Sequence, residues 1–337
     1  MSIPAKVHFG LGFGFKYQYL LSLLLHGLMN LHKDKPLINQ RKFLSCKNYM
    51  IKNLNSNPAI HANVNSFIQR IQQDFSSFSN FDYNINSLLL LEGEDKFFED
   101  INIFSTYNNS SKIDFIQVKG CGESNCRGTL NKAVIKTFKN MIDNTNTQVP
   151  FTLTILINEE LTNWYYLRHY KDRIKMIILI FRNILDMYQI AAAKKNKIIN
   201  IFENYLVDMY LFGPSTSVLN FVQQNSTTNE YNNIFYSLLS QNSNYLINKF
   251  LKIKHIVDNT RIINKLDHRL IYLFLKFHYG NDKLKKILWN IEMKSMSGVA
   301  LPLNIFRVQL QKINFNSTYM STIRFSRGHQ LKKGKIL

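Results

Sequence analysis

The sequence predicts an α/β fold for the N-terminal part of the chain, with a mixed sheet flanked by helices over 1–160, and an all-α domain over 161–337. Four segments before residue 160 are rich in β-branched and aromatic residues and are separated by turn-forming residues, which is typical of strands. After residue 161, apolar residues recur at helical spacing. A chain of 337 residues also exceeds the usual size of about 150 residues for one domain, so two domains are expected.

The elements of the first domain are expected in the order helix, three strands, helix and strand, with one further short helix before the strands. The first helix, over 11–32, carries one apolar stripe, made of Tyr17, Leu20, Leu21, Leu24, Leu25 and Leu28. The stretch 33–61 is polar and is expected to be irregular. The later elements are expected as a short helix at 63–76, strands near 86–92, 99–106 and 112–120, a helix at 129–142 and a strand at 151–157.

The second domain is expected to be helical and strongly basic. Its helices are predicted at 163–192, 195–212, 231–253, 260–278 and 282–293, with breaks at Pro214 and at the polar run 223–229. The net charge of the chain is +20, but residues 1–160 hold 16 basic and 13 acidic residues, whereas residues 161–337 hold 26 and 9. This excess of positive charge in the second half predicts a polyanionic partner, with nucleic acid as the first candidate.

The composition also bears on the compartment and on the kind of chemistry. Cys46, Cys121 and Cys126 do not form the pattern of a secreted disulfide framework, which indicates a reducing cytoplasm. Cys121 and Cys126 lack the second pair of ligands that a structural zinc site needs. No apolar run approaches the roughly 18 residues of a membrane span, so no membrane partner is expected. A Ser/His/Asp signature is also missing, which gives an acyl hydrolase no support.

Charged and amide side chains are expected to meet where the start of one predicted strand lies beside the end of the next. Gln117 and Lys119 share one face of their strand, because side chains alternate along a strand. Asp100 opens the preceding strand, and antiparallel pairing across the polar turn 107–111 brings it close to them. A carboxylate and an amide oxygen suit Mg²⁺ or Mn²⁺, and an ammonium can steady the attacking water and the charge that develops on phosphorus. The pattern therefore predicts metal-dependent phosphodiester cleavage.

This order of elements and these residues resemble the PD-(D/E)XK nuclease superfamily, and more closely the double-stranded DNA endonuclease domains of bacterial anti-phage defence systems, such as the nuclease subunit of Lamassu-like systems. The resemblance covers roughly the first half of the chain. It is carried by Gly14-Phe15-Lys16-Tyr17-Gln18-Tyr19, by Glu92, by Glu99-Asp100-Ile101 and by Ile116-Gln117-Val118-Lys119. It implies a restriction-endonuclease-like fold for the first domain.

The resemblance also implies a role for each matching residue. Asp100 would be the metal-binding acid, Gln117 would stand at the acidic position of the (D/E)XK triplet, and Lys119 would be the catalytic lysine. Gln18 would reach the site from the first helix. The backbone carbonyl of Val118 would be an additional metal ligand. A neutral amide at Gln117 departs from the general pattern of the superfamily and lowers the affinity for a second metal ion.

Several assignments stay open from the sequence alone. Glu92 is a less favoured metal ligand, and Asp95 and Glu99 replace Asp100 if the strand register is shifted by one residue. Lys119 could instead be an edge lysine that blocks sheet aggregation. Gln18 could instead lie on a solvated helix face.

The helix after the site carries a basic face. Lys132, Lys136 and Lys139 are spaced i, i+4 and i+7, and together with Arg127 they are candidates for contacts with the nucleic-acid backbone. The alternative is an ordinary solvated helix surface.

The predicted function is that of a Mg²⁺-dependent endodeoxyribonuclease acting on double-stranded DNA, an effector subunit of an anti-phage or anti-plasmid defence complex that is kept inactive until triggered. Self-association and a separate regulatory or ATPase protein are the expected partners. One alternative is a non-catalytic basic nucleic-acid-binding protein, such as an organellar ribosomal protein. Another is an interaction subunit with a decayed nuclease fold.

Overall fold

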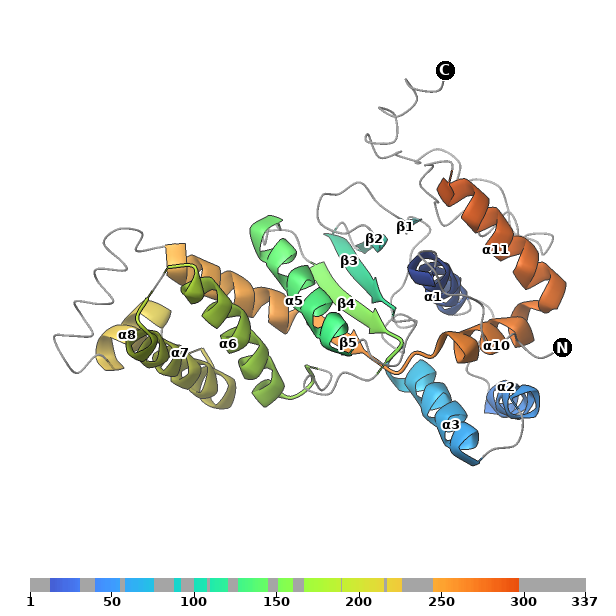
Figure 1. The fold of residues 1–337 in the computed structure, drawn as a ribbon, viewed down its shortest axis with the longest axis horizontal. Helices are drawn as coiled ribbons and strands as arrows, with labels where there is room; N and C mark the ends of the chain where they lie inside the picture. Colours follow the sequence, from blue (N-terminus) through green and yellow to red (C-terminus); the bar gives the residue numbers. More distant parts are fainter. Residues whose placement is uncertain are drawn as a thin grey trace, which may run out of the picture. The chain divides into compact units, whose positions relative to one another are not determined.

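The computed structural model describes residues 13–30, 40–54, 58–75, 88–91, 100–107, 110–120, 127–144, 151–159, 167–188, 190–214, 217–225 and 245–296. Within these residues the protein is a mixed α/β protein that is mostly helical (Figure 1). The chain divides into two compact units. The first unit comprises 1–130, 149–160 and 263–337, and the second comprises 131–148 and 161–262. Each unit is therefore built from separate stretches of the sequence.

The first unit combines a sheet with helices from both ends of the chain. Its helices are α1 (Phe13–Asn30), α2 (Gln40–Asn53), α3 (Pro58–Gln73), α10 (His268–Tyr279) and α11 (Asn281–Met296). Its strands are β1 (Leu88–Leu91), β2 (Ile101–Tyr107), β3 (Ser110–Lys119) and β4 (Phe151–Ile157). A short strand, β5 (Thr260–Ile263), ends where the chain returns to this unit.

The strands β1, β2, β3 and β4 are neighbours in that order. The pairs β1–β2 and β2–β3 are antiparallel, whereas β3 and β4 are parallel. In the β2–β3 pair Ile101 lies opposite Ile116, and in the β3–β4 pair Lys119 lies opposite Ile157. Strand β3 is therefore bonded to a neighbour on each side as far as Ile116, whereas its last residues, 117–119, pair with β4 alone.

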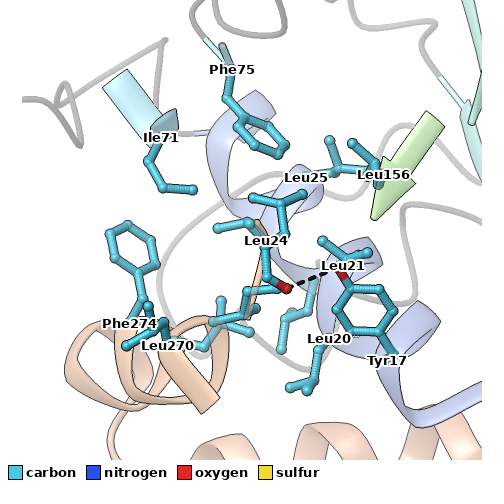
Figure 2. Close-up of a cluster of buried hydrophobic side chains, with 14 of the residues drawn as sticks. Tyr17, Leu20, Leu21, Leu24, Leu25, Ile71, Phe75, Leu156, Leu270 and Phe274 are labelled. Carbon is cyan, nitrogen blue, oxygen red and sulfur yellow. Dashed lines mark hydrogen bonds between the residues drawn. The ribbon is translucent and has the colours of Figure 1, made fainter. Parts of the chain in front are cut away.

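The middle of helix α1, from Tyr17 to Leu25, is buried on all sides in the core of the first unit. Every residue from Tyr17 to Leu25 is buried, so the helix has no solvated face there, although a single apolar stripe was expected. Figure 2 shows α1 side chains among those of Ile71, Phe75 and Phe274. The Tyr17 hydroxyl donates a hydrogen bond of 2.9 Å to the carbonyl of Leu266, drawn as a dashed line. This bond fixes α1 to the segment that leads into α10.

One face of the sheet belongs to the same core. Ile101, Ile103, Ile116 and Leu156 are fully buried in the cluster that contains α1. Because side chains alternate along β3, Gln117 must point to the face opposite Ile116. The core thus determines which face of β3 carries the polar side chains.

The second unit is a bundle of helices. It contains most of α5 (Arg127–Asn144), together with α6 (Tyr170–Asp186), α7 (Ala192–Phe212), α8 (Val218–Asn225) and a helix over 245–258. Its centre is aromatic: the ring of Phe181 lies 4.8 Å from that of Phe202 and 5.2 Å from that of Phe250, measured between centroids. All three side chains are fully buried, which ties α6, α7 and the 245–258 helix together.

Several predicted elements are confirmed and others are wrong. The strand at 151–157 is found with the predicted bounds, and the helices at 11–32 and 129–142 correspond to α1 and α5. The stretch 33–61 was expected to be irregular, but it contains α2. Among the α2 side chains that the structure describes, Cys46 and Met50 are the buried ones, and they lie among polar residues.

The second half of the chain departs further from the prediction. The expected helix at 260–278 begins as β5, and α10 starts only at His268, after Asp267. Helix α8 was not expected. The second half is therefore not all-α, and from Ile263 onward it belongs to the first unit. Residues 231–244 of the expected helix at 231–253 lie outside the described residues. Among the residues that the structure describes, every helix is too short or too polar to span a lipid bilayer.

Candidate active site

Asp100 lies at the junction of β2 and β3, immediately before β2, where it faces the C-terminal end of β3 at the end of the strand pair opposite the connecting turn. Ile101 pairs with Ile116, so continuing this register by one residue places Asp100 beside Gln117. The Oδ2 atom of Asp100 accepts a hydrogen bond of 2.7 Å from the backbone N–H of Val118. This bond orients the carboxylate toward the end of β3, where the other polar side chains are found.

Lys119 joins the polar groups of this junction. Its Nζ atom donates to Oε1 of Gln117 at 2.6 Å and lies 3.8 Å from Oδ2 of Asp100. The side chains of Lys119 and Asp100 are each 22% exposed, whereas Gln117 is 7% exposed. One ammonium therefore contacts an amide oxygen and a carboxylate at a position that solvent still reaches.

Gln18 comes to the same place from helix α1. It is 4% exposed, and its Nε2 atom donates a hydrogen bond of 2.6 Å to the backbone carbonyl of Asp100. The atom that makes this contact is a donor, so the contact positions Asp100 and does not supply an oxygen ligand. It also connects the site to the buried core through α1.

The structure bears on two of the alternatives that the sequence left open. Gln18 is buried, so it does not lie on a solvated helix face. Lys119 pairs with Ile157 of β4 and lies beyond the last β3 residue that pairs with β2, and its ammonium contacts Gln117 and Asp100. Both residues contact Asp100, directly or through its backbone.

The oxygens at this junction fit a hard divalent cation. Asp100 provides a carboxylate and Gln117 an amide oxygen, and a carbonyl oxygen has two lone pairs, so the bond from Lys119 leaves Gln117 able to accept another partner. The N–H and C=O of a strand residue point to the same side, so the Val118 carbonyl is directed toward the side on which Asp100 lies. Mg²⁺ commonly binds one or two carboxylates together with water and substrate phosphates. This donor set meets that requirement.

Other candidate ligands are not placed. Glu92, Asp95 and Glu99 lie outside the described residues, as do Cys121 and Cys126. In the part of the chain that the structure describes, no group of three or more His, Cys, Asp or Glu side chains comes together. Cys46 is buried, and burial raises the pKa of its thiol to about 12, so it is not a reactive thiolate.

The predicted nucleic-acid contacts lie on α5. Lys132, Lys136 and Lys139 are all exposed on this helix, as their spacing predicts, and they belong to the second unit. Arg127 is the first residue of α5, and its side chain lies outside the described part of the structure.

Sequence reasoning missed the backbone anchor of the site. The N–H of Val118 holds the Asp100 carboxylate, although only the carbonyl of Val118 was expected to take part. The antiparallel register gives the signal for this contact. Asp100, the residue before β2, faces the end of β3, whose N–H groups have no partner on β2.

Comparisons with models of protein families, with curated proteins and with solved structures found no match for this chain.

Proposed function

We propose that this protein is a metal-dependent endodeoxyribonuclease, a hydrolase of phosphodiester bonds in double-stranded DNA. The observation that supports this most strongly is the convergence of Asp100, Gln117 and Lys119, with the Lys119 ammonium 2.6 Å from the amide oxygen and 3.8 Å from the carboxylate. The carboxylate and the ammonium are each 22% exposed at the end of β3, so solvent and a substrate can still reach them.

Each side chain has a defined role in the proposed reaction. Asp100, Gln117 and the Val118 carbonyl hold Mg²⁺ or Mn²⁺, which supplies Lewis-acid polarisation of the phosphoryl oxygens when bound. Lys119 orients the attacking water and stabilises negative charge on the phosphoryl group in the transition state. Gln18 keeps the backbone of Asp100 in place through its hydrogen bond to the Asp100 carbonyl. The product carries a 5′-phosphate by resemblance to the PD-(D/E)XK nucleases.

The arrangement of the sheet supports a restriction-endonuclease-like fold for the first unit. Strands β1, β2 and β3 form an antiparallel meander, and β4 runs parallel to β3. Helix α5 lies between β3 and β4 in the sequence, as a crossover between parallel strands requires. The candidate site lies at the end of β3, immediately before this crossover.

A plasmid-cleavage assay tests the assignment. Supercoiled plasmid is incubated with the protein in Mg²⁺, in Mn²⁺ and in a chelator, using the wild type, Lys119→Ala and Lys285→Ala. Lys285 is an exposed lysine of α11 in the same unit, so its replacement removes the same charge away from the site. We expect cleavage to require the metal and to fall by about 100-fold or more in Lys119→Ala, with Lys285→Ala unchanged.

Two results would reject the proposal. Equal cleavage by Lys119→Ala and wild type would remove the active site from this junction. A wild-type protein that binds DNA but never cleaves it under any metal condition would favour a non-catalytic nucleic-acid-binding protein.

The cellular role is also a proposal. An unregulated DNA nuclease would damage host DNA, so we propose an effector subunit of a cytoplasmic anti-phage or anti-plasmid defence complex, controlled by self-association and by a separate regulatory or ATPase protein. The support is the resemblance of the site residues to nucleases of such systems.

A further inference from the structure

The exposed face of α5 is a row of lysines that ends in one acid. The exposed residues that the structure describes on this helix are Lys132, Lys136, Lys139, Asn140 and Asp143. At 1.5 Å rise per residue, successive charged positions are about 5–6 Å apart along the helix. Asp143 lies on the same face as the lysines, because it follows Lys132 by 11 residues, or about three turns.

A lysine from another helix neutralises that acid. The Nζ atom of Lys249, on the 245–258 helix, lies 3.0 Å from Oδ1 of Asp143. The Asp143 side chain is 66% exposed, so this pair is at the surface. Lys252 follows Lys249 by three residues and lies on the neighbouring turn of the same helix. Both helices belong to the second unit.

The electrostatics of the two lysines agree with this arrangement. Burial acts to lower the pKa of Lys249, but the hydrogen bond and the charge of Asp143 outweigh it and the pKa is raised. The pKa of Lys252 is lowered, first by burial and then by repulsion from Lys249, and Asp143 offsets this only in part. The positively charged surface therefore extends from α5 to Lys249 and Lys252 on the 245–258 helix.

The remaining lysines of the row are not neutralised in the same way. Within the described residues, no acid forms an ion pair with Lys132, Lys136 or Lys139. Among the described residues, the ion pair that these five lysines form is therefore the one between Lys249 and Asp143. Beside them the exposed ring of Tyr245 lies under the Lys249 ammonium, which is 5.3 Å from the ring centroid.

We propose that this surface, the lysine band of Lys132, Lys136, Lys139, Lys249 and Lys252, binds the phosphodiester backbone of duplex DNA. The inference rests on the proposed function, since it names the surface that holds the substrate. Regularly spaced cations with little acid between them match a polyanion with one charge per about 1.7 Å of helix axis. An amphipathic helix at a membrane surface would expose large apolar residues beside its lysines. The exposed residues described on α5, which carries three of the five lysines, include none, whereas the 245–258 helix exposes Tyr245 and Leu251.

The band predicts one variant that binds DNA better and one that binds it worse. Asp143→Asn removes the acid that pairs with Lys249 and releases Lys249 for a phosphate, so affinity should rise and the slope of log K against log salt should steepen by about 0.9. The double variant Lys139→Ala/Lys252→Ala should reduce that slope by about 1.8. The matched control is Lys171→Ala/Lys175→Ala, two exposed lysines with i, i+4 spacing on α6 of the same unit.

The measurement is fluorescence anisotropy of a labelled DNA duplex with the full-length protein in chelator, over a range of salt concentrations. Gain of affinity in Asp143→Asn cannot arise from partial unfolding. Equal losses in the band variant and the α6 control would overturn the proposal, because binding would then be spread over the surface. Binding to phosphatidylglycerol vesicles in place of DNA would also overturn it.

These experiments distinguish failure of the proposed DNA-binding surface from failure of the proposed nuclease activity. Lys119→Ala should bind DNA like the wild type in chelator and yet not cleave it with metal. If the band variants bind normally while the wild type cleaves, the band is wrong and the proposed nuclease stands. If the band variants lose binding while the wild type never cleaves, the nuclease assignment is wrong and the band stands.

Discussion

At the scale of the residue, the contact between Lys119 and Gln117 determines which atom of the Gln117 amide faces the candidate metal site. An amide side chain presents an oxygen or an NH₂ group, depending on its orientation, and an ammonium can only donate. Because Lys119 Nζ lies 2.6 Å from Gln117 Oε1, the amide must turn its oxygen toward the ammonium, which also lies 3.8 Å from the Asp100 carboxylate. The lysine therefore selects the orientation in which Gln117 has the donor atom that a hard cation needs.

This contact gives a prediction for substitutions at Gln117. Gln117→Glu should keep cleavage, because the carboxylate supplies the same oxygen with more charge and remains an acceptor for Lys119. Gln117→Ala should lose about 100-fold or more of the rate, since it removes both the oxygen and the acceptor. The comparison is made by plasmid cleavage, with thermal unfolding as the control for folding. Normal cleavage by Gln117→Ala would show that this residue is not a ligand.

At the scale of the element, the site was easier to predict than its surroundings. Alternation along β3 and a turn of polar residues placed Gln117, Lys119 and Asp100 together, because a hairpin register depends on local sequence alone. The role of Gln18 as a donor was not visible, because it depends on how α1 packs against distant segments. The strand β5 was missed because four residues, Thr260 to Ile263, give too short a pattern to distinguish a strand from a helix turn.

The start of α10 gives a pH-dependent prediction. Asp267 accepts a hydrogen bond of 2.8 Å from the backbone N–H of Arg269 and pairs with its guanidinium at 2.6 Å. Burial acts to raise the pKa of Asp267, but the hydrogen bonds and charge of Arg269 outweigh it and hold the pKa below its ordinary value of 3.8. The stabilisation is therefore fully present above that value and is lost as the pH falls through the lower folded-state pKa.

Asp267→Ala should consequently lower the free energy of unfolding by about 1 kcal/mol at neutral pH. This difference in unfolding free energy between wild type and variant should shrink toward zero in strong acid, where the wild-type carboxyl is protonated and carries no charge. Thermal or denaturant unfolding of both proteins at several pH values measures this difference. A difference that is the same at neutral and strongly acidic pH would mean that the carboxylate charge contributes nothing to the cap.

At the scale of the whole molecule, neither unit corresponds to one continuous stretch of the sequence. The first unit needs the chain from Ile263 onward, which returns after the second unit has been completed. This segment contributes ten buried residues to the core around α1: Ile263, Leu266, Leu270, Ile271, Leu273, Phe274, Leu275, Leu284, Ile287 and Ile291. A boundary at residue 160, suggested by the change from strands to helices, therefore cuts through one folded core.

A chain that ends at residue 160 should not fold cooperatively. The ten lost side chains contribute on the order of 15–30 kcal/mol of apolar burial, which exceeds the net stability of about 5–15 kcal/mol that folded proteins have. Tyr17 would also lose the Leu266 carbonyl that accepts its buried hydroxyl. Circular dichroism with thermal unfolding tests this. A sharp unfolding transition in the 1–160 chain would mean that α10 and α11 are dispensable for the core.

The last prediction concerns assembly. One active site cuts one strand, whereas a double-strand break needs two sites facing opposite strands, which two protomers related by symmetry provide. The apolar side chains of α6, such as Ile177, Ile180 and Phe181, are buried within the second unit, so they are not free for such packing. Exposed apolar residues of that unit lie elsewhere, with Phe212 at the end of α7 79% exposed and Leu211 51% exposed.

We therefore expect the isolated chain to nick DNA weakly and to make double-strand breaks with a rate that rises steeply with protein concentration. Phe212→Ser should weaken self-association and double-strand breaks while leaving nicking by each site unchanged, because the substitution lies in the second unit. Analytical sedimentation combined with the plasmid assay measures both quantities on the same samples. A strictly monomeric protein that makes double-strand breaks at full rate, independent of concentration, would show that a single protomer cuts both strands in succession.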